Sequence, residues 1–84
     1  MRKQFFVEYE SDVYNRGHWN QNTNDYGCNI WFAGNASTIR SAKSIIRNIR
    51  KNRVEENPRN FKVYDCWADV EQETDHVPCV YFED

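Results

Sequence analysis

The chain has 84 residues, with 11 Lys and Arg against 13 Asp and Glu, and a formal net charge of −2. A chain of this length folds around one modest hydrophobic core, which excludes the large cofactor-binding folds and a deep cleft between domains. Aromatic residues make up 15% of the sequence, and this proportion argues against intrinsic disorder because disordered segments are poor in aromatic residues.

The first part of the chain predicts a β-hairpin with a long loop. Residues 4–10 alternate, with Phe5, Val7 and Tyr9 on one side, which is typical of a half-buried strand. Residues 11–25 contain Gly17 and several asparagines, residue types that favour turns, and we interpret them as a polar loop. Alternation resumes over residues 26–33, which we expect to form the second strand of the hairpin.

A helix from about residue 37 to residue 53 is the clearest element of the sequence. Candidate N-cap residues precede a set of apolar residues at helical spacing. The caps are Asn35, Ser37 and Thr38, and the apolar set is Ile39, Ala42, Ile45, Ile46 and Ile49. Pro58 prevents a continuation, because proline disfavours helical geometry in the residue before it.

Two further strands are expected after the helix. Residues 61–70 are rich in aromatic and β-branched residues, residues 71–75 form a polar turn, and residues 77–82 form a second short strand. The element order is therefore β-β-α-β-β. We expect one α+β domain over residues 1–84, with a four-stranded antiparallel sheet and one helix on one face.

Pairing the last two strands in the simplest register predicts which residues share a face. It places Cys66 opposite Cys79, Tyr64 opposite Tyr81 and Ala68 opposite Val77. The other face would carry the apolar residues Phe61, Val63, Trp67, Val80 and Phe82. Since one helix covers only one face of the sheet, we expect exposed aromatic residues on the face that the helix leaves uncovered. They would serve a partner or a homodimer, unless residues 11–25 fold over them.

The polar residues predict no catalytic or metal site. Cys28, Cys66 and Cys79 lack CxxC spacing and are expected to be reduced, with a Cys66–Cys79 disulfide left open. His18 and His76 do not complete a recognisable zinc ligand set, so neither a metal nor another cofactor is expected. The short chain also lacks a glycine-rich phosphate loop, which favours a protein that is not an enzyme.

Localisation follows from hydropathy. No apolar run approaches the roughly 20 residues of a membrane span, and the N-terminus turns polar too soon for a signal peptide. We therefore expect a cytoplasmic protein without a membrane partner.

Charge is sorted along the chain. Residues 26–54 contain six basic residues and no acid, whereas residues 65–84 contain seven acids and no Lys or Arg. On a helical wheel, a basic ridge lies away from the apolar side; it comprises Arg40, Lys43, Arg47, Arg50 and Lys51. Such a ridge suits binding to nucleic-acid phosphates or to an acidic patch of a protein. The alternative is that these residues only keep the helix soluble and complement its dipole.

The segment FAGNASTIRSAKSI, residues 32–45, resembles the strand, Ser/Thr cap and helix opening of small phage-encoded β-β-α-β-β proteins, some of which are anti-CRISPR proteins. Proteins of that kind bind a bacterial CRISPR effector complex stoichiometrically and block DNA access or cleavage without chemistry of their own. The resemblance implies a phage or mobile-element protein that acts in the host cell on a bacterial protein or ribonucleoprotein complex.

The resemblance transfers no binding residues, so the candidate contacts come from the residues themselves. Besides the basic ridge, Trp19 and Trp67 are candidate anchors, because buried Trp and Arg dominate many binding energies. Two alternatives stay open. One is a small nucleic-acid-binding domain that uses the basic helix, and the other is a homodimeric interaction module.

Overall fold

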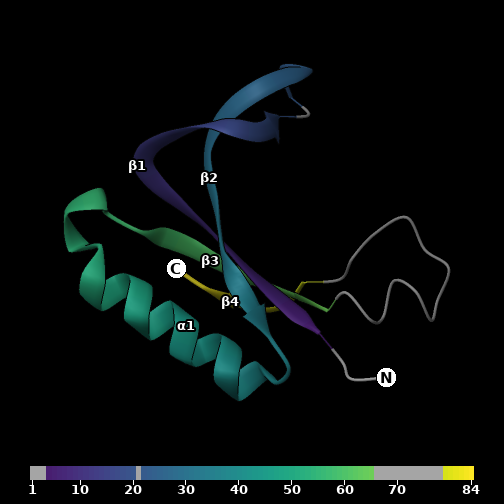
Figure 1. Cartoon of the computed structure of the whole chain (residues 1–84), viewed down its shortest axis with the longest axis vertical. Helices are drawn as coiled ribbons and strands as arrows, with labels where there is room; N and C mark the ends of the chain where they lie inside the picture. The colour runs from purple at the N-terminus through teal and green to yellow at the C-terminus, as the bar shows by residue number, and fades with distance from the viewer. Residues whose placement is uncertain (1–3, 21, 66–78) are drawn as a thin grey trace, which may run out of the picture.

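The computed structural model describes residues 4–20, 22–65 and 79–84. The strands β1 (Phe5–Asn20), β2 (Asp25–Ala36), β3 (Arg59–Asp65) and β4 (Cys79–Glu83) form one antiparallel sheet in the order β2-β1-β3-β4. The helix α1 (Ile39–Asn52) lies along one side of the sheet, and a short 3₁₀ helix, η1 (Val54–Glu56), follows it (Figure 1). The predicted α+β fold and the order β-β-α-β-β are confirmed.

The hydrophobic core lies between α1 and one face of β1 and β3. Alternate residues of both strands face the helix, as the two-residue period of a strand requires. The buried apolar residues are Phe5, Val7, Tyr9, Ala42, Ile46, Phe61 and Val63. Tyr9 and Phe61 stack across the two strands with ring centroids 5.4 Å apart. This packing fixes the helix to the centre of the sheet.

The ends of α1 follow the capping rules. The Thr38 hydroxyl accepts a hydrogen bond from the backbone N–H of Ser41 at 3.0 Å, which satisfies one of the free N–H groups of the first turn. Beyond the helix, Asn57 adopts a left-handed conformation with φ of 53° and ends η1 just before Pro58. The predicted helix over residues 37–53 therefore extends one to two residues too far at each end.

The predicted polar loop over residues 11–25 is wrong. β1 continues to Asn20 and β2 already begins at Asp25, so most of this segment belongs to a long hairpin. The pairing shifts register between Glu10 and Asn15 and again between Asn15 and Trp19. Side-chain N–H groups cross to the neighbouring strand within this irregular stretch, from Asn15 to the Ile30 carbonyl, from Asn29 to the Ser11 carbonyl, and from Trp31 to the Val13 carbonyl.

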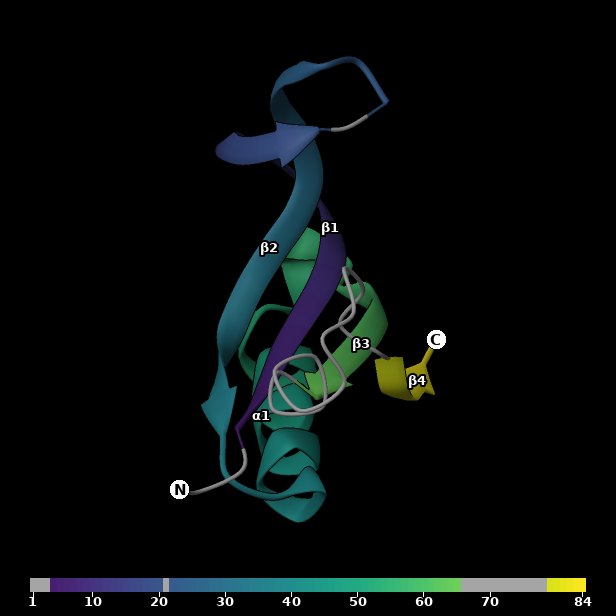
Figure 2. The ribbon, with the colours of Figure 1, turned by 90° about the vertical axis from the view of Figure 1, so that its right-hand side faces the viewer.

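These register shifts turn the end of the hairpin. In Figure 2 the last part of β1 runs across the direction of its first half. A bulge adds local twist to a strand, and two successive irregularities in one strand accumulate that twist. Two of the asparagines that suggested a loop, Asn15 and Asn20, therefore bond across the hairpin, and Asn22 and Asn24 lie in its turn.

The predicted register of the last two strands is also wrong. Val63 lies opposite Tyr81, one residue away from the predicted register, and an extra residue of β4 between Tyr81 and Cys79 shifts the pairing again, so that Tyr64 lies opposite Cys79. Phe82 lies opposite Lys62, so it does not share a face with the helix-facing Phe61 and Val63 as predicted. Cys66, Trp67, Ala68 and Val77, together with the predicted turn over residues 71–75, lie outside the described residues.

Aromatic side chains gather on the face of the sheet that α1 does not cover. Phe6 stacks on Tyr64 with centroids 4.8 Å apart and contacts Phe32 at 6.2 Å. Phe32 is 58% exposed. We call this side of the sheet the open face.

Replacing Gly27 with alanine is expected to destabilise the hairpin. Gly27 has φ of 122°, and the Tyr14 hydroxyl occupies the space that a Cβ atom at position 27 would need. The positive φ and the close approach of Tyr14 both disfavour a side chain at position 27. Gly27→Ala should therefore lower the free energy of unfolding by about 1–3 kcal/mol, as measured by urea denaturation.

Gly17→Ala is the matched control for this variant. A Cβ atom at position 17 would meet only the Asn15 Oδ1 atom at 3.6 Å, an ordinary contact distance. This variant should change the free energy of unfolding by less than about 0.5 kcal/mol. Equal effects of the two substitutions would contradict the packing of Tyr14 against Gly27.

Candidate functional site

One candidate surface is a line of exposed basic side chains on α1, which we call the basic stripe. It comprises Arg40, Lys43, Arg47 and Lys51. Spacings of three and four residues place them on one side of the helix. The helix contains no acidic residue, and none of the ion pairs among the described residues involves the stripe. Its positive charge therefore faces solvent without a neutralising carboxylate from the described chain.

Arg50, although part of the predicted ridge, contacts the C-terminal strand. Its guanidinium carbon lies 4.6 Å from the ring centroid of Phe61, and its Nε lies 3.6 Å from a carboxylate oxygen of Glu83. It also donates a hydrogen bond to the backbone carbonyl of Asp84. Phe61 lies on β3, whereas the contacts with Glu83 and Asp84 tie the end of β4 to the helix, so Arg50 is not included in the basic stripe. Lys43 remains exposed while its ammonium lies 4.6 Å from the ring centroid of Tyr81.

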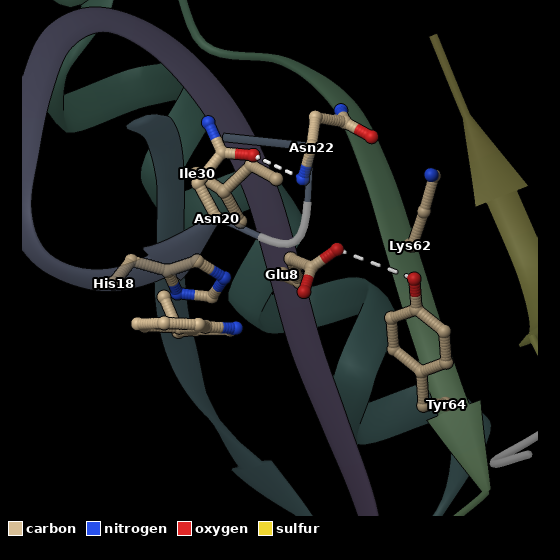
Figure 3. A pocket seen from close by; sticks show the side chains of 8 residues that line it. Glu8, His18, Asn20, Asn22, Ile30, Lys62 and Tyr64 are labelled. Carbon is tan, nitrogen blue, oxygen red and sulfur yellow. Dashed lines mark hydrogen bonds between the residues drawn. The ribbon is translucent and has the colours of Figure 1, made fainter. Parts of the chain in front are cut away.

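The second candidate surface is a pocket of about 360 Å³ on the open face, which we call the hairpin pocket (Figure 3). The central strands provide Glu8, Lys62 and Tyr64, and the hairpin provides the other lining residues, His18, Trp19, Asn20, Asn22 and Ile30. The bend in β1 lets side chains from the end of the hairpin line the same pocket as residues of the two central strands. Part of the open face is thereby bordered by residues that the sequence assigned to a loop.

Hydrogen bonding and charge organise the floor of the hairpin pocket. The Tyr64 hydroxyl donates to Glu8 Oε1 at 3.2 Å. Burial raises the pKa of Tyr64 to about 12, and the negative charge and hydrogen bond of Glu8 act in the same direction. Lys62 lies directly opposite Glu8 in the strand register, yet no ion pair joins these two described side chains. Both rise from neighbouring strands into the pocket (Figure 3).

The hairpin wall is held by its own contacts. The Asn20 side chain donates to the Gly27 carbonyl at 3.2 Å and accepts from the Asn22 backbone N–H at 3.0 Å. Trp19 packs edge-to-face on Tyr26 with centroids 5.1 Å apart and is still 45% exposed. An aromatic surface is therefore positioned beside the charged floor before any ligand binds.

The predicted site residues fall on two opposite sides of the sheet. The four residues of the basic stripe lie together on α1, with Arg50 beside them. Trp19 lines the hairpin pocket on the open face, and Trp67 lies outside the described residues. Glu8, Lys62 and Tyr64 could not be recognised as site residues in the sequence, because only the register between β1 and β3 places them together.

Other site classes find no support in the residues that the structure describes. Cys28 is half-buried and Cys79 is exposed, and both are free thiols. Over residues 4–20, 22–65 and 79–84, no group of three or more His, Cys, Asp or Glu is placed to hold a metal ion. Within the same ranges, no helix has the length and apolar character needed to cross a membrane.

Comparison of the chain with protein-family models, with curated proteins and with solved structures finds no match. No functional residue is therefore transferred from a relative. The two candidate surfaces are defined by geometry and charge alone.

The raised pKa of Tyr64 predicts a loss of stability in alkaline solution. Its folded-state pKa of about 12 exceeds the ordinary value of 10.0, so the folded protein holds this proton more tightly than the unfolded chain. The resulting stabilisation is complete below the ordinary pKa and disappears as the pH rises through the folded-state value. In urea denaturation across this pH range, the free energy of unfolding should fall more steeply with pH for the natural chain than for Tyr64→Phe. Equal pH dependence of the two chains would contradict the raised pKa of Tyr64.

Proposed function

We propose that this chain is a non-catalytic binding protein of a phage or mobile element. It docks through the basic stripe on an acidic surface of a bacterial nucleic-acid-handling complex of the CRISPR effector type and blocks that complex. The observation that supports the proposal most is the stripe itself, four exposed basic side chains on a helix without any acid. The β-β-α-β-β order also agrees with the resemblance of residues 32–45 to small phage-encoded inhibitors.

The stripe is suited to steering and orienting a partner. Exposed ion pairs contribute only about 0–1 kcal/mol each, so four of them supply association rate and register more than affinity. Apolar contact is available at the C-terminal end of the helix, where Val54 is 66% exposed. One apolar side chain therefore lies near the end of the stripe.

The surroundings of the stripe favour a protein over a nucleic acid. Glu55 and Glu56 follow the helix in η1, Glu83 ends β4, and Asp84 follows it; Arg50 contacts both of these last two residues. These acids would repel a continuous phosphate backbone. A protein surface with an acidic centre and basic surroundings matches both signs of charge. The net charge of −2 points in the same direction, because nucleic-acid-binding domains are commonly basic.

Charge reversal within the stripe tests the proposal. The double variant Arg47→Glu and Lys51→Glu alters two exposed side chains and leaves Arg50 and its contacts with β4 in place. The tagged protein should capture a defined protein complex from nuclease-treated bacterial lysate. Affinity for that complex should fall at least roughly tenfold in the double variant, because opposed like charges cost free energy at an interface.

Arg16→Glu provides the matched control, because Arg16 is exposed on the hairpin and far from α1 along the chain. This control should bind as the natural chain does. Capture that disappears after nuclease treatment would favour the nucleic-acid-binding alternative. Binding that survives the double reversal at low salt would show that the stripe is only a solvated surface.

A further inference from the structure

The size of the hairpin pocket corresponds to a small ligand or a single chemical group of a larger one. Its volume of about 360 Å³ falls within the range of roughly 300–1,000 Å³ that is usual for small-molecule sites. The pocket lies on the open face and the basic stripe lies on the helix that covers the other face. An inference about the pocket therefore goes beyond the proposed function and does not depend on it.

The charges on the floor favour a ligand group that is neutral overall. Glu8 and Lys62 are opposite in sign and directly opposite in register. The carboxylate disfavours a bound phosphate, and the ammonium disfavours a bound cation. A neutral group that presents hydrogen-bond donors beside an acceptor satisfies both side chains at once.

The wall of the pocket favours a planar group. Trp19 is 45% exposed, and its contact with Tyr26 fixes its orientation. Exposed aromatic side chains of this kind form stacking platforms for nucleobases, since every base has a π-face. Planarity, neutrality and a mixed hydrogen-bonding edge together describe a nucleobase.

Among the bases, guanine fits the floor best. Its Watson–Crick edge carries two neighbouring N–H donors, N1–H and the N2 amino group, beside the O6 acceptor. A carboxylate accepts both donors and an ammonium group donates to O6. Adenine and cytosine offer Glu8 only their amino group, and uracil has a single donor between two acceptors. The hydrogen bond from Tyr64 holds Glu8 in place for such a contact.

We propose that the hairpin pocket binds a guanine base, with Glu8 accepting from its N1 and N2 groups, Lys62 donating to O6 and Trp19 stacking on the ring. The base belongs either to a free nucleotide or to a single-stranded nucleic acid. Both sources present the same edge to the same side chains, because single-stranded bases are recognised through stacking and their Watson–Crick edges.

Titration with the four nucleoside monophosphates tests the proposal. Calorimetry on the full chain should show that guanosine monophosphate binds at least roughly tenfold more tightly than uridine monophosphate, with the adenosine and cytidine forms between them. Glu8→Gln should remove most of this preference, because an amide accepts through one oxygen only. Trp19→Ala should weaken all four nucleotides by a similar factor, since stacking does not depend on the edge.

Glu55→Gln is the matched control, because it makes the same chemical change in η1, away from the pocket lining. It should leave the preference unchanged. If Glu8→Gln fails to fold, as judged by its circular dichroism spectrum, Lys62→Met provides a second test through the loss of the donor to O6. This variant should reduce the advantage of guanosine monophosphate over its competitors.

An oligouridylate with one central guanosine separates the two sources of the base. Tighter binding of this strand than of guanosine monophosphate would identify a single-stranded nucleic acid, and equal binding would identify the nucleotide. The proposal is overturned if guanosine monophosphate shows no saturable binding, if it binds no better than uridine monophosphate, or if both floor variants keep the full preference.

Discussion

Side-chain hydrogen bonds replace the backbone ladder where β1 leaves the register of β2, and the shape of the open face depends on them. The Asn15 amide donates to the Ile30 carbonyl at 2.8 Å, and the Asn29 amide donates to the Ser11 carbonyl at 2.9 Å. Backbone carbonyls that lose both their ladder partner and water are costly. These bonds allow β1 to bend without that cost, and the bend lets Trp19 line the same pocket as Glu8 and Tyr64.

The core separates the two candidate surfaces. Helix α1 buries one face of β1 and β3 and exposes the basic stripe to solvent, with Lys43 beside Tyr81 of β4. The hairpin pocket lies on the other side of the same strands. A flat partner surface therefore contacts only one of them at a time. A protein bound along the stripe leaves the pocket accessible, so the proposed docking and the proposed base recognition are physically compatible in one complex.

The features that follow from local periodicity could be predicted from the sequence. The helix, the element order and the basic side of α1 depend on spacings of two, three and four residues, which the chain carries within each element. The bent hairpin was missed because asparagine is typical of turns, whereas here Asn15 and Asn29 bond across strands. Arg50 was assigned to the ridge because its contacts with β4 are distant in sequence. Glu8 and Lys62 meet only through a register that no local pattern fixes.

Residual dipolar couplings of the backbone N–H groups test most directly whether side-chain amides hold the bend of the hairpin. In the natural chain, couplings from the end of the hairpin and from the first half of β1 should fit one alignment tensor with the bent orientation of Figure 2. In the double variant Asn15→Ala and Asn29→Ala, the couplings from the end of the hairpin should no longer fit the tensor that describes the core strands. Couplings that the double variant leaves unchanged, or that fit a straight hairpin in the natural chain, would contradict this account.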